Sequence, residues 1–315
     1  MQRRALIIGA KGQDGFYLDA HLQRLGYEVV RAGRDSVKVG SQDRPFDVLD
    51  FGLVSDLIGE LLPNEVYYLA AHHHSSQENP ENLLDLFSKS YQVHCQGLAA
   101  TLEAIATRSP LSRLFYAASS LVFGMPQVAP QNEQTPYAPI CAYGITKVAG
   151  IELCRLYHRE KEIFCSAGIL YNHESPRRKE TFITRKLVKA AVSASRGKLT
   201  KVTIGSLSGK VDWTAAEDTV RAMHAILQLD QPEEFVVASG TLHTVREFAD
   251  SAFALVGLDY RQYVEENGSV LQRSGRAVPF VGDSELLREK TDWSPQISFE
   301  GLIEMMIKAE LEANA

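Results

Sequence analysis

The sequence has 315 residues, of which 45% are hydrophobic and 23% charged, and its formal net charge is −6 at pH 7. This composition is typical of a globular protein with one large α/β domain and a smaller lobe. Lysine and arginine are scattered along the chain, which argues against a nucleic-acid-binding protein but leaves room for a pocket that binds a small anion. No run approaches the roughly 18 apolar residues of a membrane span.

Strand and helix patterns alternate in the first half of the chain. Apolar runs predict buried strands over residues 4–9, 27–33, 65–71, 113–118 and 163–170. Amphipathic patterns between them predict helices over residues 15–26, 51–62, 82–107 and 142–160. Nearly continuous apolar strands that are separated by helices are typical of a doubly wound parallel sheet. We therefore expect an α/β protein with a Rossmann-type sheet.

The pattern loosens after about residue 170. We predict helices near residues 181–197, 215–229, 244–256 and 299–313, and short strands near residues 200–204 and 234–238. No internal repeat is visible. We expect residues 1–170 to form the sheet domain and residues 171–315 to form mainly a smaller α/β lobe, with some segments returning to the sheet domain.

The cysteines and the amino-terminal run indicate the compartment. Cys95, Cys141, Cys154 and Cys165 form no Cys-x-x-Cys pair and lie in apolar segments, as is typical of free thiols in a reducing compartment. The run "MQRRALIIGAKG" has only a short apolar stretch before a glycine turn, so we interpret it as a first strand rather than a signal peptide. A cytoplasmic protein is expected.

The stretch "GAKGQDG", residues 9–15, stands between the first strand and the first helix. Its glycines, Gly9, Gly12 and Gly15, allow a tight turn and a close approach of the backbone to a pyrophosphate. The helix that follows offers unbonded N–H groups and a favourable dipole to the same phosphates. This stretch predicts a dinucleotide cofactor.

The end of the second strand, "VVRAGRDS", bears on which dinucleotide is bound. Gly33 occupies the position where an acid usually holds the ribose 2′-hydroxyl of NAD, and Arg34 follows it. Because an arginine can pair with a 2′-phosphate, NADP is favoured over NAD. Two alternatives stay open: Arg31 and Arg34 are solvated loop charges, or Asp35 is the ribose acid in a slightly different register.

A tyrosine and a lysine lie one helical turn apart in "CAYGITK". Tyr143 and Lys147 share a helix face, and an ammonium beside a phenol lowers the pKa of the phenol from its ordinary value near 10. Such a pair suits proton transfer at an alcohol oxygen while a hydride moves on carbon. Ser119 and Ser120, at the end of the fourth strand, either orient that oxygen or cap backbone groups.

Taken together, these motifs resemble the extended short-chain dehydrogenase/reductases, and among them the GDP-mannose 4,6-dehydratase branch. The stretches that carry the resemblance span most of the chain: "GAKGQDG", "YLAA", "AASSLVFG", "AYGITK", "YNHESPRRKETFITRK" and "VDW". The resemblance implies an NADP-binding domain over residues 1–170 and a nucleotide-sugar lobe over residues 171–315. It also implies catalysis by Ser119, Tyr143 and Lys147.

The resemblance also implies binding roles for individual residues. The expected cofactor contacts, with Arg34 added from the strand argument above, are Gly9, Gly12, Gln13, Asp14, Gly15, Arg34, Asp47, Val48, Leu69, Ala70, Ala71, Tyr143 and Lys147. The expected substrate contacts are Ser119, Ser120, Asn172, Thr184, Lys186, Lys210 and Arg273. Arg177 and Arg178 either bind the diphosphate or serve the structure of their loop or a subunit contact.

One position departs from the dehydratase pattern in a way that bears on the reaction. The resemblance implies a glutamate two places after the catalytic serine, where this chain has Leu121, and Phe123 replaces a common tyrosine. A hydrocarbon can neither donate nor accept a proton, so the elimination of water lacks its acid/base. We therefore expect a 4-keto reductase or 4-epimerase acting at C4 of a nucleotide-linked hexose, most simply a GDP-sugar.

Several alternatives remain. One of His72, His73 and His74 could move the proton instead, and consecutive histidines seldom converge on one ion, so no metal is expected. Val211 beside Lys210 and Arg276 also depart from the pattern, which leaves base and sugar open. The other candidates are a dehydratase with a substituted acid/base and a catalytically silent NADP-binding scaffold. The apolar helices over residues 82–107 and 142–160 predict a homodimer or homotetramer, as in this superfamily.

Overall fold

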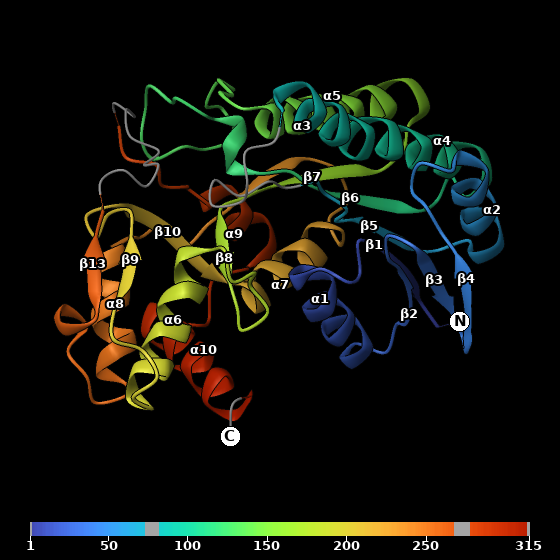
Figure 1. Ribbon diagram of the computed structural model, residues 1–315. Helices are drawn as coiled ribbons and strands as arrows, with labels where there is room; N and C mark the ends of the chain where they lie inside the picture. The colour runs from blue at the N-terminus through green and yellow to red at the C-terminus, as the bar shows by residue number, and fades with distance from the viewer. Residues whose placement is uncertain (1, 73–81, 268–277, 314–315) are drawn as a thin grey trace.

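The computed structural model of the chain describes residues 2–72, 82–267 and 278–313, and its centre is an eight-stranded sheet (Figure 1). The strand order is β11-β7-β6-β5-β1-β2-β3-β4, in which the strands from β11 to β2 are parallel and β3 and β4 are antiparallel. The predicted doubly wound parallel sheet is confirmed. Its strands are β1 (Arg4–Ile8), β2 (Glu28–Ala32), β3 (Ser36–Val39), β4 (Gln42–Pro45), β5 (Glu65–Tyr68), β6 (Arg113–Ala117), β7 (Cys165–Leu170) and β11 (Glu234–Val237).

Helices cover both faces of this sheet because its strands are apolar on both sides. In β1, Leu6 and Ile8 join the core on one face, and Ala5 and Ile7 join the core on the other. The first face packs against α2 (Phe51–Leu61), α4 (Leu98–Arg108) and α5 (Ala142–Lys161), with α3 (Leu83–Tyr91) beside α5. The second packs against α1 (Gln13–Arg24), α7 (Ala216–Ile226) and α9 (Glu285–Thr291).

A smaller lobe has its own apolar core, on the left and lower left of Figure 1. Its helices are α6 (Ile183–Ser195), α8 (Val245–Ala254) and α10 (Phe299–Ala313). Its strands form two small sheets, β12-β10-β8 and β13-β9: β8 (Asn172–Glu174), β9 (Val202–Ile204), β10 (Lys210–Ala215), β12 (Leu242–Thr244) and β13 (Val264–Glu266). Three later segments, α7, β11 and α9, return to the main sheet.

Two local features differ from the sequence-based expectations. The helix predicted over residues 82–107 is interrupted by a π-helical turn at Gln92–Gly97, which joins α3 to α4. Such turns, with i→i+5 hydrogen bonds, occur as single-turn bulges inside α-helices. The hairpin of β3 and β4 was not predicted, because "SVKV" and "QDRP" carry few apolar residues and lie at the sheet edge.

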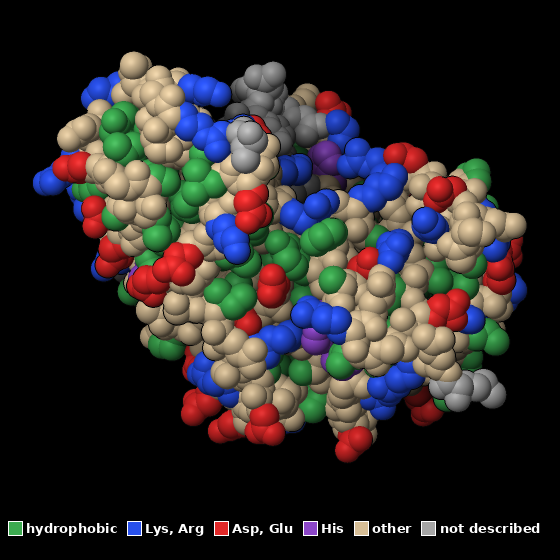
Figure 2. Space-filling model, turned by 90° about the horizontal axis from the view of Figure 1, so that it is seen from below, with side chains coloured by type: hydrophobic (Ala, Val, Ile, Leu, Met, Phe, Trp, Pro, Cys, Tyr) green, Lys and Arg blue, Asp and Glu red, His purple; other side chains and the backbone are tan. Residues whose placement is uncertain are grey.

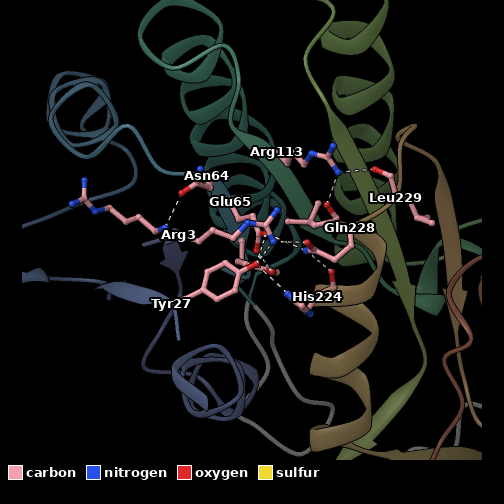
Figure 3. Close-up of polar contacts among 11 residues, drawn as sticks. Arg3, Tyr27, Asn64, Glu65, Arg113, His224, Gln228 and Leu229 are labelled. Carbon is pink, nitrogen blue, oxygen red and sulfur yellow. Dashed lines mark hydrogen bonds and ion pairs between the residues drawn. The ribbon is translucent and has the colours of Figure 1, made fainter. Parts of the chain in front are cut away.

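The amino-terminal edge of the sheet is closed by a buried carboxylate (Figure 3). Glu65 opens β5 with 1% of its surface exposed. Its oxygens accept hydrogen bonds from the hydroxyls of Tyr27 (2.8 Å) and Tyr67 (2.7 Å) and from the Gln228 amide (3.0 Å), and Arg3 lies 3.8 Å away. Tyr27 directly precedes β2, and Gln228 lies just beyond the end of α7. The network therefore links β2 and α7 to Glu65 at the start of β5.

All four cysteines are free thiols, three of them buried and Cys141 half-buried. Within the described ranges, no helix combines the length and the apolar character needed to cross a bilayer.

We predict that Glu65→Gln lowers the free energy of unfolding by about 2 kcal/mol, because an amide leaves at least one buried donor of this network without an acceptor. Glu28→Gln is the matched control, since it removes a solvent-exposed partner of Arg4 and should cost less than about 1 kcal/mol. Urea denaturation measures both. Equal losses in the two variants would contradict this account of the network.

Candidate active site

A cavity of about 540 Å³ opens at the carboxyl ends of the parallel strands, where open α/β sheets bind ligands. Its walls come from the loop before α1, the ends of β5, β6 and β7, the first turns of α5, and the segment between β7 and α6. Ten of the residues expected in the site lie on these walls: Gly12, Gln13, Asp14, Leu69, Ala71, Ser119, Ser120, Tyr143, Lys147 and Asn172. The fold therefore brings together segments that are far apart in the sequence.

The glycine loop is shaped for close backbone contact. Gly9 has φ +99°, and a Cβ there would lie 2.7 Å from the backbone nitrogen of Ala70. A Cβ on Gly15 would lie 2.5 Å from Cα of Ala10. Gly12 is the N-cap of α1, and in the described part of the chain no side chain caps it. The loop thus presents the first turn of a helix to the cavity, which fits the diphosphate of a dinucleotide.

A lysine that the sequence analysis did not single out lies beside the end of β2. The Lys11 side chain crosses Gly33, since a Cβ on Gly33 would lie 2.8 Å from Cε of Lys11. Arg34 is exposed in the turn from β2 to β3, whereas Arg31 forms an ion pair with Asp19 at 2.7 Å. Lys11 and Arg34 are therefore the cations at the expected ribose position. The sequence signal that could have identified Lys11 was the presence of a basic residue inside the glycine loop "GAKGQDG".

The remaining expected cofactor residues lie behind the cavity or at its side. Ala70 packs against Gly9 and stands in the sequence between Leu69 and Ala71, which both line the cavity. Asp47 accepts a hydrogen bond from the backbone nitrogen of Leu49 (2.9 Å), and Val48 packs against the core of the sheet. Neither Asp47 nor Val48 lines the cavity.

Tyr143 and Lys147 both reach the cavity from the first turns of α5. The Lys147 amine donates a hydrogen bond to the carbonyl of Ala117 (2.6 Å) and lies 5.5 Å from the centre of the Tyr143 ring. Burial lowers the pKa of Lys147 to about 7, and burial, helped by the charge of Asp14, raises the pKa of Tyr143 above its ordinary value. The expected lowering of the phenol pKa is wrong here, because both groups are removed from water.

A histidine in the π-helical turn supports the tyrosine, and the sequence analysis missed it. The buried ring of His94 meets Tyr143 edge-on, with ring centres 5.0 Å apart. His94 Nε2 accepts a hydrogen bond from the backbone nitrogen of His72 (3.1 Å), so Nδ1 of the neutral ring donates to the Thr146 hydroxyl (2.8 Å). His94 thus holds the helix turn that carries Tyr143.

The serine pair and the leucine after it lie at the end of β6. The Ser119 hydroxyl lines the cavity and accepts a hydrogen bond from the backbone nitrogen of Leu121 (3.3 Å), so it caps the turn Ser120–Val122. Leu121 lines the cavity, whereas Phe123 is fully buried. Among the described residues of the cavity wall, Asp14 carries the only carboxylate. The position of Leu121 therefore supplies an apolar surface.

The expected substrate residues divide into two groups. Asn172, Arg177 and Arg178 line the cavity. Thr184, Lys186 and Lys210 do not: Thr184 donates to Glu174 (2.6 Å), Lys186 donates to the carbonyl of Thr203 (2.7 Å), and Lys210 is exposed on β10. Four residues of the sequence analysis lie outside the described ranges: His73, His74, Arg273 and Arg276. No group of three metal-binding side chains occurs among the described residues.

The cavity is cationic although the chain carries a net charge of −6. Five basic side chains line it against one carboxylate: Lys11, Lys147, Arg177, Arg178 and Lys179. Charge is also uneven on the face drawn in Figure 2, where lysine and arginine side chains (blue) gather in the upper middle of the view. Such a cavity suits ligands with several negative charges, such as organic diphosphates.

Comparisons with known proteins agree on the family. The family model described as GDP-mannose 4,6 dehydratase matches residues 6–306. GDP-mannose 4,6 dehydratase 2 of Arabidopsis thaliana is 35% identical, with 98% of this chain and 87% of the relative aligned. GDP-mannose 4,6-dehydratase of Vibrio cholerae is 30% identical, with 99% and 95% aligned.

Solved structures show the same fold at lower sequence identity. RMD from Pseudomonas aeruginosa, complexed with NADPH, has a TM-score of 0.84 and 20% identity, over 99% of this chain and all (100%) of that one. UDP-glucose 4-epimerase from Thermotoga maritima, with UDP-glucose, has a TM-score of 0.83 and 19% identity, over the same shares, 99% and 100%.

The buried amine leads to a prediction about stability and pH. The pKa of Lys147 is lowered from 10.5 to about 7 in the folded protein, so between these values the unfolded chain binds a proton that the folded chain does not. The free energy of unfolding of the wild type should therefore rise with pH over this interval, relative to Lys147→Met, by up to about 1.4 kcal/mol per pH unit.

Urea denaturation at pH 7, 8 and 9 measures the difference. Lys161→Met, at the exposed end of the same helix, is the control and should keep the slope of the wild type. Parallel profiles for the wild type and K147M would contradict the burial of a neutral amine.

Proposed function

The chain belongs to the GDP-mannose 4,6 dehydratase family, and from this membership and its cavity we propose an NADP(H)-dependent enzyme acting at C4 of a nucleotide-linked hexose. Its simplest activity is the reduction of a 4-keto GDP-sugar. The observation that carries the proposal is a cationic cavity that keeps Ser119, Tyr143 and Lys147 together and has Leu121 where elimination needs an acid/base. A 4-epimerase would use the same residues and return hydride to the opposite face.

The residues of the cavity suit proton donation. NADPH, when bound, supplies the hydride that adds to C4 of the keto-sugar. Tyr143 then donates its phenolic proton to the C4 oxygen, for which a raised pKa is suitable because the phenol stays protonated at neutral pH. Ser119 would orient the same oxygen with its hydroxyl, and the Lys147 amine, which holds the turn of α5 near Ala117, would hold the nicotinamide ribose.

The cofactor is proposed to be NADP(H) on the strength of two cations. Lys11 lies over Gly33 and Arg34 follows it, and no acidic side chain of β2 occupies the position that would hold a ribose 2′-hydroxyl. Ammonium and guanidinium groups favour a 2′-phosphate. The diphosphate is assigned to the first turn of α1.

The substrate assignment rests on the lobe. Asn172, Arg177 and Arg178 face the cavity from the segment between β7 and α6, where they would meet the diphosphate of a nucleotide sugar. We assign residues 1–170 to cofactor binding and residues 171–315 mainly to nucleotide-sugar binding. A GDP-sugar is favoured by the names of the curated relatives.

Two further assignments are part of this proposal. Exposed apolar side chains on α3 and α5, among them Leu83, Phe87 and Ile145, favour a homodimer or homotetramer formed through these helices. A cytoplasmic location is in keeping with four free thiols.

A second candidate is the 4,6-dehydratase activity itself, because the curated relatives carry that name. It needs a substitute for the acid/base at Leu121. The described cavity wall carries one carboxylate and one imidazole, those of Asp14 and His173, which are bonded to each other.

We predict that Lys11→Ala weakens the binding of NADPH about tenfold more than the binding of NADH, because it removes a cation from the expected position of the 2′-phosphate. Arg34→Ala should act in the same direction. Arg31→Ala is the control, since Arg31 is already paired with Asp19. Fluorescence titration gives the dissociation constants, and equal losses for NADPH and NADH in K11A would refute the assignment.

We predict that the enzyme oxidises NADPH with a GDP-4-keto-6-deoxyhexose and that Tyr143→Phe lowers the rate by about 10²–10⁴. Tyr157→Phe, farther along the same helix with its hydroxyl 3.1 Å from Glu103, should keep the rate of the wild type. Incubation of GDP-mannose with NADP⁺ tests the second candidate. Prompt formation of the 4-keto-6-deoxy product would replace the reductase with the dehydratase.

A further inference from the structure

The first turn of α1 is bonded to the strand that opens the smaller lobe. The Gln13 amide donates to the backbone carbonyl of His173 (3.0 Å), and the Ser175 hydroxyl donates to the Gln13 side-chain oxygen (2.8 Å). Next to these bonds, Nε2 of His173 lies 3.0 Å from a carboxylate oxygen of Asp14. The first turn of α1 and the segment that begins with β8 are thus in direct polar contact through four side chains, those of Gln13, Asp14, His173 and Ser175.

The geometry of His173 fixes its protonation. Its Nδ1 lies 2.8 Å from the backbone carbonyl of Tyr171, and because a carbonyl only accepts, Nδ1 carries a hydrogen. A neutral ring would then direct the lone pair of Nε2 at the Asp14 carboxylate. A hydrogen bond at 3.0 Å requires a second proton between them, and because an imidazole is more basic than a carboxylate, this proton makes the pair an imidazolium and a carboxylate.

The pair is poorly screened by water, because the two side chains are 13% and 21% exposed. Burial lowers the pKa of His173, but the attraction to Asp14 and the hydrogen bond with it have the larger combined effect, so the pKa is raised. Burial raises the pKa of Asp14, but the attraction to His173, the hydrogen bonds from His173 and Gln13 and the charge of Arg178 together outweigh it, so the pKa is lowered. Both directions agree with the protonation read from the geometry.

Other charged groups face the pair from the elements around it. Arg178, from the loop after β8, acts on both members of the pair. Tyr143 on α5 faces Asp14, and its raised pKa keeps it protonated through the physiological range. Arg177 and Lys147 line the same cavity, and Lys147 titrates near pH 7. Asp14 remains the only carboxylate among the described wall residues.

We propose that Asp14 and His173 hold one proton that tight dinucleotide binding requires, and that this proton ties the cofactor loop to the substrate lobe. The inference rests on the proposed function, which assigns a diphosphate to the first turn of α1, beside Asp14. With the proton present, the pair is neutral and β8 is bonded to the loop. When the proton leaves, the pair has charge −1, repels the diphosphate and loses its hydrogen bond.

The affinity for NADPH should fall as the pH rises. Above the pKa of His173 the dissociation constant for NADPH rises with pH, and dinucleotide binding takes up a proton there. Lys147 loses its positive charge in part of the same range, so it adds to the pH dependence of every variant that retains it. The proposal is therefore tested by differences between variants.

The experiment is a fluorescence titration of NADPH between pH 7 and 9.5 with the full chain and two variants. In Asp14→Asn the amide donates to a neutral His173, so the pair is uncharged throughout. Between pH 7 and pH 9.5 its dissociation constant should rise about tenfold less than that of the wild type. In His173→Gln the Asp14 charge is never neutralised, so binding should be about tenfold weaker than wild type at pH 7 and similar at pH 9.5.

Parallel pH profiles for the wild type and D14N would overturn the proposal. Failure of the wild type to bind NADPH at any pH would instead overturn the proposed function. Nitrogen-15 NMR of the unmodified protein is independent of how the variants fold, with H173Q used only to identify the signals. At pH 7 we expect both ring nitrogens of His173 to be protonated, and a neutral ring would equally overturn the proposal.

Discussion

The site depends on one hydrogen bond in a place that water barely reaches. The amine of Lys147, 1% exposed, donates to the carbonyl of Ala117 where β6 ends, and so fixes α5 to the sheet. Ser119 follows Ala117 by two residues, and Tyr143 precedes Lys147 by one helical turn. The bond therefore sets the phenol and the serine hydroxyl relative to each other. Its energetic cost is the loss of hydration of the amine, which lowers the pKa of Lys147 to about 7.

The elements that the sequence predicts well are those buried on both sides. Strands such as "RALII" and "CSAGIL" are apolar throughout because helices cover both faces of the sheet, and this pattern needs no knowledge of distant residues. The edge hairpin of β3 and β4 lacks such a pattern, and the turn after Gly33 sets the pairing of β3 with β2. The π-helical turn around His94 was not predicted either, because helical patterns on both sides of it do not show where i→i+5 hydrogen bonds replace i→i+4 bonds.

The site was predictable where chemistry follows local spacing. The glycine loop and the pair of Tyr143 and Lys147 are read from a few neighbouring residues, and these line one cavity. The contact of Asp14 with His173 joins residues 159 positions apart in the sequence, and no pattern among neighbouring residues predicts it. The direction of the Tyr143 pKa failed for a related reason: spacing shows that an ammonium is near but does not show how far water is excluded.

The same exclusion of water bears on which reactions the cavity favours. A phenol with a raised pKa is a poor base but remains a proton donor at neutral pH, which supports the proposed reductive direction. Elimination of water from a sugar needs a second group that can both take and give a proton near C5 and C6. The hydrocarbon side chain of Leu121, on the cavity wall, can do neither. The one carboxylate on the described wall is held by His173, where its charge offsets an imidazolium. In the proposed reductase, the surplus of cations on the described wall would bind the diphosphates, and Tyr143 would donate the proton while a hydride adds to the ketone.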